Sequence, residues 1–249
     1  GIRDRSPSRG LGDVYKRQLQ NRVALITGAS RGIGAAIAKH FAKEGAHVIL
    51  VARTVGGLEE VDDEIKKHGG SATLIPCDLN EFDRVDNMGP SLYERFGQLD
   101  IFVGNAAILG SMTPLVQYDS KTWHNVFNTN IHANWHLMRV VEPLLKLSDS
   151  GRAIFVSSAA AKKPKAYWGA YAITKSALET MAKVWASELE NTSVRVNVLN
   201  PGPTRTAMRG TAFPGENPNT LKSADEVAGA FIELASPNCK SNGEIIDLI

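Results

Sequence analysis

A tyrosine and a lysine four residues apart form the pair in this sequence best suited to proton transfer. Tyr171 and Lys175 lie in a stretch that is expected to be helical, so their side chains point to the same side. A lysine ammonium beside a phenol favours the phenolate and lowers the phenol pKa toward neutrality. Such a tyrosine could exchange a proton with a substrate oxygen near physiological pH. Taken alone, a Tyr-x-x-x-Lys pair is common by chance.

Two polar residues upstream could complete a site around this pair. Ser158 follows a predicted strand, thirteen residues before Tyr171, where its hydroxyl could hold a carbonyl oxygen. Neighbouring Ser157 could do this instead, and either serine could simply satisfy the strand end. Asn130 lies within a predicted helix, 41 residues before Tyr171. Asparagine is a poor helix former, so either a local kink that holds a water or a solvent-exposed face would explain it.

A glycine-rich turn spans residues 27–34, between a short apolar run and an amphipathic stretch. Gly28, Gly32 and Gly34 have no Cβ, so the backbone can turn sharply and approach a ligand closely. The following helix begins there, and its free N–H groups and dipole suit a pyrophosphate. Glycines also cluster in turns that bind nothing. The order of strand, turn and helix nevertheless favours a dinucleotide site.

Arginines near this turn favour a phosphorylated cofactor. The second predicted strand ends at Arg53, where an acid would bond a ribose 2′-hydroxyl and an arginine suits a 2′-phosphate. Arg31 adds a second cation, so the sequence predicts NADP(H) rather than NAD(H). The alternative is two exposed arginines in surface ion pairs. Asp78 could accept from an adenine amino group with Leu79 beside the ring, or could be an ordinary loop aspartate.

Strand and helix patterns alternate along the chain. Apolar runs predict strands at 23–27, 48–52, 72–77, 99–103, 152–157, 194–199 and 244–249. Helical patterns cover 32–44, 58–68, 81–96 with a break at Gly89-Pro90, 120–147, 168–190 and 224–235, the last with Ser223 as N-cap, while 200–222 reads as a long loop. The fold class is therefore α/β, a single-domain doubly wound parallel sheet of about seven strands with helices on both faces. Ligands in such folds bind at the carboxyl ends of the strands.

Composition excludes several classes of function. The formal charge of +2 arises in residues 1–17, which hold five basic and two acidic residues, so the body gives no reason to expect nucleic acid. No apolar run is long enough to cross a bilayer. Cys77 and Cys239 have no metal-ligand spacing and are expected to be reduced thiols of a cytoplasmic protein, with no metal site. Residues 1–18 are expected to be a disordered tail, either non-native or a mobile native segment, which leaves 19–249 as the domain.

The chain resembles a short-chain dehydrogenase/reductase from Val23 to its end. The motifs that carry the resemblance occur in family order: 27–34, Asp78-Leu79, Asn105-Ala106, Asn130, Ser158, Tyr171-x-x-x-Lys175 and Asn200-Pro-Gly202. The resemblance implies Tyr171 as catalytic acid/base, Lys175 as its tuner and a ribose ligand, Ser158 as the group that orients the carbonyl, and Asn130 as the holder of a relay water. It implies that the cofactor contacts Gly28, Ser30, Arg31, Gly32, Ile33, Gly34, Arg53, Asp78, Leu79, Asn105, Ala106, Ala107, Tyr171, Lys175, Pro201, Gly202 and Thr204.

The sequence departs from the family in three places. After the fourth predicted strand, Gly104 and Ala107 flank Asn105-Ala106, where the family has Asn and Gly. These two changes are expected to narrow the floor of the cofactor site, which this turn forms. The family continues past a Gly-Gly at the C-terminus, so a clipped end at Ile249 is expected. The segment 204–214 resembles a bacterial subgroup of oxidoreductases whose substrate is not settled.

The sequence therefore predicts an NADP(H)-dependent oxidoreductase acting on a small-molecule carbonyl/alcohol pair. The alternatives are an NAD(H) enzyme of the same fold and a non-catalytic NADP(H) sensor. The substrate is expected between Ser158, Tyr171 and the loop 204–222, a possible lid. Trp168, Met208 and Phe213 are candidate pocket walls. The resemblance also implies a homodimer or homotetramer built on the helices around 120–147 and 169–190.

Overall fold

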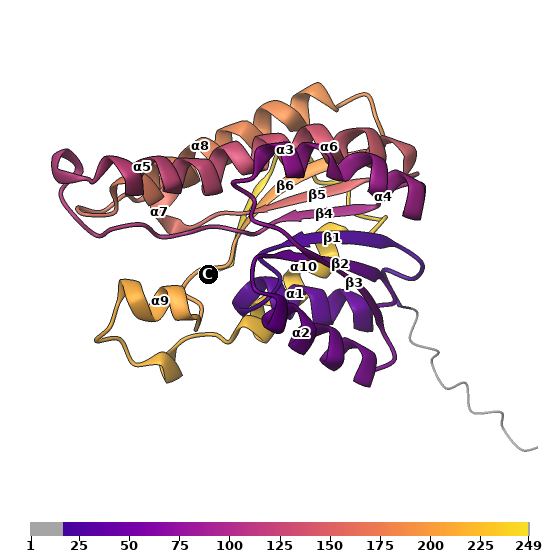
Figure 1. Cartoon of the computed structure of the whole chain (residues 1–249), viewed down its shortest axis with the longest axis horizontal. Helices are drawn as coiled ribbons and strands as arrows, with labels where there is room; N and C mark the ends of the chain where they lie inside the picture. The colour runs from indigo at the N-terminus through magenta and orange to yellow at the C-terminus, as the bar shows by residue number, and fades with distance from the viewer. Residues whose placement is uncertain (1–16, 249) are drawn as a thin grey trace, which may run out of the picture.

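Seven parallel strands form one sheet in the computed structural model, which describes residues 17–248. Their order is β3-β2-β1-β4-β5-β6-β7, and Figure 1 shows the sheet between two layers of helices. The strands are β1 (Val23–Thr27), β2 (His47–Ala52), β3 (Ser71–Pro76), β4 (Ile101–Gly104), β5 (Arg152–Val156), β6 (Arg195–Asn200) and β7 (Ile245–Asp247). The predicted fold class is confirmed.

The helices divide between the two faces of the sheet. On one face lie α1 (Gly32–Lys43), α2 (Val55–Lys67) and α10 (Ala224–Ala235). On the other lie α3 (Phe82–Asp86), α4 (Met88–Phe96), α5 (Ser120–Phe127), α6 (Ala133–Leu147), α7 (Ala159–Lys162) and α8 (Gly169–Glu188), while α9 (Ala207–Ala212) stands apart from both layers (Figure 1). Each face has its own apolar core, because the central strands are buried on both sides.

The sheet order reverses between β1 and β4. Chain order runs outward from β1 through β2 to β3, then returns to the other side of β1 with β4. The connections on the two sides of this point lead to opposite faces, which opens a crevice above the carboxyl ends of the strands. The glycine turn after β1 and the segment after β4 meet there.

Three elements differ from the sequence predictions. The break in 81–96 falls at Asn87, because Pro90 sits in the first turn of α4, where no helical N–H is needed. The helix 120–147 is divided by a π-helical segment, Asn128–His132. The loop 200–222 contains α9 and a short 3-10 turn, Pro218–Thr220. Ser223 caps α10 as predicted, in a capping box with Glu226.

The predicted tail lies largely outside the described residues. Nothing is described for 1–16, and the description starts at Arg17. The backbone N–H of Gln18 donates to the Glu44 carboxylate at 3.0 Å, which ties residue 18 to the end of α1. Cys77 is buried and Cys239 half-buried, both as free thiols. Within residues 17–248, no helix combines the length and apolar character that a membrane-spanning segment requires.

Candidate functional site

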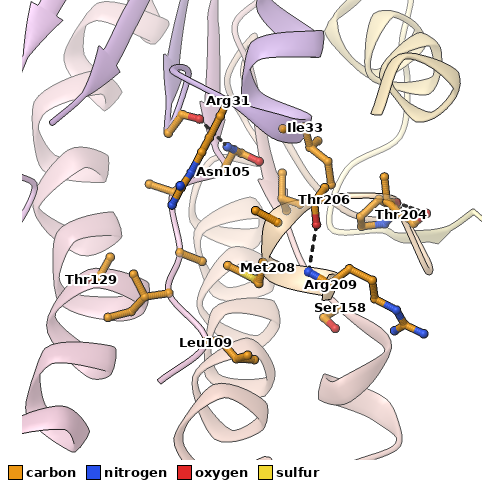
Figure 2. A pocket seen from close by; sticks show the side chains of 18 of the residues that line it. Arg31, Ile33, Asn105, Leu109, Thr129, Ser158, Thr204, Thr206, Met208 and Arg209 are labelled. Atoms are coloured by element: carbon orange, nitrogen blue, oxygen red, sulfur yellow. Dashed lines mark hydrogen bonds between the residues drawn. The ribbon is translucent and has the colours of Figure 1, made fainter. Parts of the chain in front are cut away.

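One pocket of about 790 Å³ lies at the carboxyl ends of the strands. Figure 2 shows Arg31 and Asn105 toward one end and Leu109 and Ser158 toward the other. Of the predicted site residues, those that line it are Gly28, Ser30, Arg31, Gly32, Ile33, Arg53, Asp78, Leu79, Asn105, Ala106, Ala107, Ser158, Tyr171, Lys175, Pro201, Gly202 and Thr204. The fold thus brings side chains from positions 28 to 204 into one cavity, while Gly34 and Asn130 lie behind its wall.

The glycine turn is fixed to the exit of β4 by hydrogen bonds. The Thr27 hydroxyl accepts from the backbone N–H groups of Asn105 and Ala106 at 3.0 and 3.1 Å. The Asn105 amide donates back to the Thr27 carbonyl at 2.9 Å. Gly28 has φ +65°, and a Cβ there would lie 2.9 Å from Asn105 Nδ2 and 3.1 Å from Ala106 Cα. Only glycine therefore fits this turn, which leaves the start of α1 open to a ligand.

Cations lie at this end of the pocket. Arg31 is exposed, precedes α1 in an extended conformation, and makes no ion pair within residues 17–248. Arg53 is mostly exposed, and its Nη1 lies 3.8 Å from Asp78 Oδ2. The other Asp78 oxygen accepts from the Asn80 N–H at 3.0 Å. A helix start, a Cβ-free cradle and two available guanidinium groups fit a phosphorylated dinucleotide.

The two neighbouring serines have different surroundings. Ser157 is buried, and its hydroxyl donates to Glu179 Oε1 at 2.6 Å. Ser158 caps α7, where its hydroxyl accepts from the Ala160 N–H at 3.3 Å, and it is also hydrogen-bonded to the Tyr171 phenol. Because the Ser157 proton is engaged by a carboxylate, Ser158 is the serine whose hydroxyl remains directed to the tyrosine.

Tyr171 and Lys175 project from α8 into the pocket, and both are buried. The Lys175 ammonium donates to the Val156 carbonyl at 2.7 Å and lies 5.7 Å from the centre of the Tyr171 ring. Burial raises the pKa of Tyr171, and the Ser158 hydrogen bond opposes this increase. Burial also lowers the pKa of Lys175 to about 8, against the attraction of Glu179.

The expected lowering of the Tyr171 pKa by Lys175 is therefore wrong for this arrangement. The spacing correctly placed the two side chains on one side of α8. It carried no information about burial, which is the largest influence on the phenol. The ammonium is also directed to a strand carbonyl rather than to the phenol oxygen.

Asn130 is fully buried within the π-helical segment, so the solvent-exposed explanation is wrong. Its amide donates to the Ile108 carbonyl and to the Thr174 hydroxyl, both at 3.0 Å, and its Oδ1 accepts from the Ile108 N–H at 2.9 Å. Asn130 thus connects Ile108, which lines the pocket, to the residue before Lys175. Its predicted role with a relay water stays a prediction.

Two details of the pocket were not foreseen. The Thr204 hydroxyl is buried and donates to the Pro201 and Gly202 carbonyls, whereas Thr206 lines the pocket and caps α9 (Figure 2). Thr206 precedes a short helical stretch, a signal that could have identified it.

Gly104 faces Phe155 and Asn134 in the core, where a Cβ would lie 2.6 and 2.7 Å from them. Of the two changes expected to narrow the floor, only Ala107 borders the pocket.

Known proteins resemble this chain in sequence and structure. The family model for short chain dehydrogenase matches residues 22–217. YciK of Escherichia coli K12, an uncharacterised oxidoreductase, is 35% identical over 222 residues, covering 87% of this chain and 86% of that protein. This agrees with the expected likeness to bacterial oxidoreductases of unsettled substrate.

Solved structures agree with that assignment. A short chain dehydrogenase from Salmonella enterica serovar Typhi superimposes with a TM-score of 0.90 at 35% identity, covering 93% of this chain and 97% of the other. A short chain dehydrogenase from Escherichia coli CFT073, complexed with NADPH, gives a TM-score of 0.89 at 35% identity, covering 93% and 98%. With the family model spanning most of the chain, these similarities show that the chain belongs to the short-chain dehydrogenases, a family of oxidoreductases.

Proposed function

We propose that this oxidoreductase transfers a hydride between NADP(H) and a carbonyl/alcohol pair, with Tyr171 as general acid/base. The observation that carries the proposal is one shared pocket. Tyr171, Lys175 and Ser158 border the same cavity as the glycine turn and the two arginines. The NADPH complex of the Escherichia coli CFT073 relative supports this choice of cofactor.

The proposal assigns each part of the cofactor to its own group of residues. Gly28, Gly32 and the start of α1 would face the pyrophosphate, and Arg31 and Arg53 would pair with the 2′-phosphate. Asp78, Leu79 and Ala106 would border the adenosine half, and Pro201, Gly202 and Thr206 the nicotinamide half. When bound, NADPH supplies the hydride, and the protein supplies position and charge.

The polar side chains then handle the proton. Ser158 would orient the substrate oxygen, and Tyr171 would donate its phenolic proton to that oxygen in reduction. The raised pKa of Tyr171 suits this direction, because the phenol stays protonated at neutral pH. Lys175 would hold positive charge beside the developing phenolate. The Asn130 side chain is hydrogen-bonded to Ile108 and Thr174 rather than to Tyr171 or Lys175. We therefore propose that Asn130 positions Ile108 and Thr174.

The test is NADPH oxidation with a panel of ketones. Tyr171→Phe removes the proton and keeps the ring, so kcat should fall by about 100-fold or more while NADPH binding changes little. Tyr93→Phe is the matched control, since Tyr93 is exposed on α4 outside the pocket. Activity that is unchanged in Tyr171→Phe would refute the assignment. Tight NADPH binding with no turnover of any ketone would favour the sensor.

We also propose that the chain forms a homo-oligomer through α6 and α8. Trp135 on α6 and Ile173 and Val184 on α8 are large apolar residues with exposed fractions of 46%, 40% and 53%. Such exposure is typical of an interface. Light scattering should give a mass of at least two chains, and Val184→Glu should lower it. The cytoplasmic location stays a prediction.

A further inference from the structure

Beyond Tyr171, large apolar side chains form much of the pocket wall. Leu109 follows β4, Trp168 precedes α8, and Met208 belongs to α9, so three separate segments build this end. Leu109 and Tyr171 belong to a small buried cluster, and Trp168 and Met208 pack against it. All four border the pocket, as does Ala212. A substrate whose oxygen lies between Ser158 and Tyr171 would have these side chains around its carbon substituents.

Trp168 is the largest surface at this end and is held by aromatic rings. Its ring centre lies 5.9 Å from that of Tyr171, edge to face, and 5.5 Å from that of Phe213. Phe213 supports Trp168 from outside and does not itself line the pocket, which corrects its predicted place as a wall. Aromatic contacts with two rings fix the orientation of Trp168. The wall next to the phenol is therefore flat, apolar and rigid.

Arg209 also borders this end, but its charge is engaged. Its Nε and Nη2 donate to the two carboxylate oxygens of Glu216, both at 2.6 Å. Its guanidinium carbon lies 3.8 Å from the centre of the Phe213 ring. Figure 2 shows the side chain running away from Leu109 and Met208. A bidentate pair with a stacked face leaves little of Arg209 for a substrate anion.

Among the described residues, the other cations that border the pocket are Arg31 and Arg53 near the glycine turn, Lys175, whose ammonium donates to the Val156 carbonyl, and Arg205. Arg205 is exposed, and its Nη1 reaches Asn219 Oδ1 at 3.5 Å. A solvated guanidinium attracts an anion only weakly, because water and salt screen its charge. A substrate carboxylate would thus face apolar side chains and a neutralised arginine, and it would lose its hydration without gaining a partner.

We infer that the substrate is a neutral ketone or secondary alcohol whose larger, apolar substituent packs on Trp168, and that Glu216 helps to exclude anionic substrates by engaging Arg209. This inference rests on the proposed function and adds the substrate class to it. Trp168 supplies the contact surface. Glu216 acts through Arg209 and is a specificity-determining residue rather than a catalytic one.

A matched pair of ketones tests the inference. Methyl 4-oxocyclohexanecarboxylate and 4-oxocyclohexanecarboxylate differ only in a neutral ester against a carboxylate. With NADPH, kcat/KM should be about tenfold or more higher for the ester. In Glu216→Gln, Arg209 loses its anionic partner, and the ratio should fall about tenfold as the carboxylate improves. Glu94→Gln, on the exposed face of α4, should keep the wild-type ratio.

The wall itself is tested with Trp168→Ala. KM for the ester should rise about tenfold or more while the Kd for NADPH stays within about threefold, because Trp168 borders the substrate end of the pocket, beside Tyr171, and not the glycine turn. A ratio that favours the carboxylate in wild type, or one that Glu216→Gln leaves unchanged, would overturn the inference while leaving the proposed function intact.

A binding measurement with the two ketones tests the substrate class separately from the proposed function. The ester should quench the fluorescence of wild type more strongly than that of Trp168→Phe, and the carboxylate should quench neither. This readout needs no turnover, so it applies even if no ketone is reduced and the proposed function fails. Equal quenching of wild type and Trp168→Phe by the ester, or stronger quenching by the carboxylate, would overturn the inference.

Discussion

Replacing Gly34 with alanine should damage the glycine turn although the helix itself would accept alanine. Gly34 lies in the first turn of α1, where alanine is the better helix former. The added Cβ would press against the Gly28 carbonyl oxygen and lie 2.5 Å from Asn105 Nδ2. The carbonyl belongs to the turn backbone and cannot rotate away. The turn must therefore shift and disturb the Asn105 bond to the Thr27 carbonyl.

The magnitude follows from two contributions. Overpacking of this kind costs about 1–3 kcal/mol, and disturbing the Asn105 hydrogen bond costs about 0.5–1.5 kcal/mol. Gly34→Ala should thus lose about 1.5–4.5 kcal/mol of unfolding free energy, measured in urea. Because Gly28 lines the proposed cofactor end of the pocket, a shift of this turn should raise the Kd for NADPH about 10- to 100-fold.

Gly229→Ala provides the control for this prediction. Gly229 lies inside α10 with no atom within 4 Å of an added Cβ. That substitution should stabilise the protein by about 0.5–1 kcal/mol and leave NADPH binding unchanged. The steric argument would be refuted if Gly34→Ala were as stable as Gly229→Ala and bound NADPH with a Kd within about twofold of wild type.

Three further predictions follow from the same pocket. Arg53→Asp should weaken NADPH binding about 10- to 100-fold and leave NADH within about threefold, by titration of both nucleotides; tighter binding of NADH than NADPH to wild type would contradict the choice of NADP(H). Asn130→Ala leaves the Ile108 N–H and C=O unpaired and should cost about 2–4 kcal/mol in urea unfolding; a loss below about 0.5 kcal/mol would show that water replaces the side chain. The pKa of Lys175 is about 8 in the folded protein, below its ordinary value of 10.5. Between these two values the unfolded chain binds more protons than the folded chain. Wild type should therefore gain stability relative to Lys175→Met as the pH rises from about 8 to about 10.5. The gain should be at most about 3 kcal/mol, and a constant difference between about pH 7 and about pH 10 would argue against a buried, titrating lysine.

Local sequence determined the elements and the order of the motifs. Continuous apolar runs predicted buried parallel strands, since a strand covered on both faces has no polar side. The glycine turn and the Tyr171-Lys175 pair were also readable, because each depends on backbone geometry over a few neighbouring residues. Parallel strands then placed their following turns at one edge, which predicted a shared site before any contact was known.

The tertiary structure decided what surrounds each of those side chains. Asn130 bonds to residues 22 and 44 positions away, and Ser157 is engaged by a glutamate 22 positions away. No local pattern encodes such partners. The direction of the Tyr171 pKa shift and the support of Trp168 by Phe213, 45 positions away, have the same origin. Burial and hydrogen bonding depend on which distant segments pack together, and only the folded chain brings them into contact.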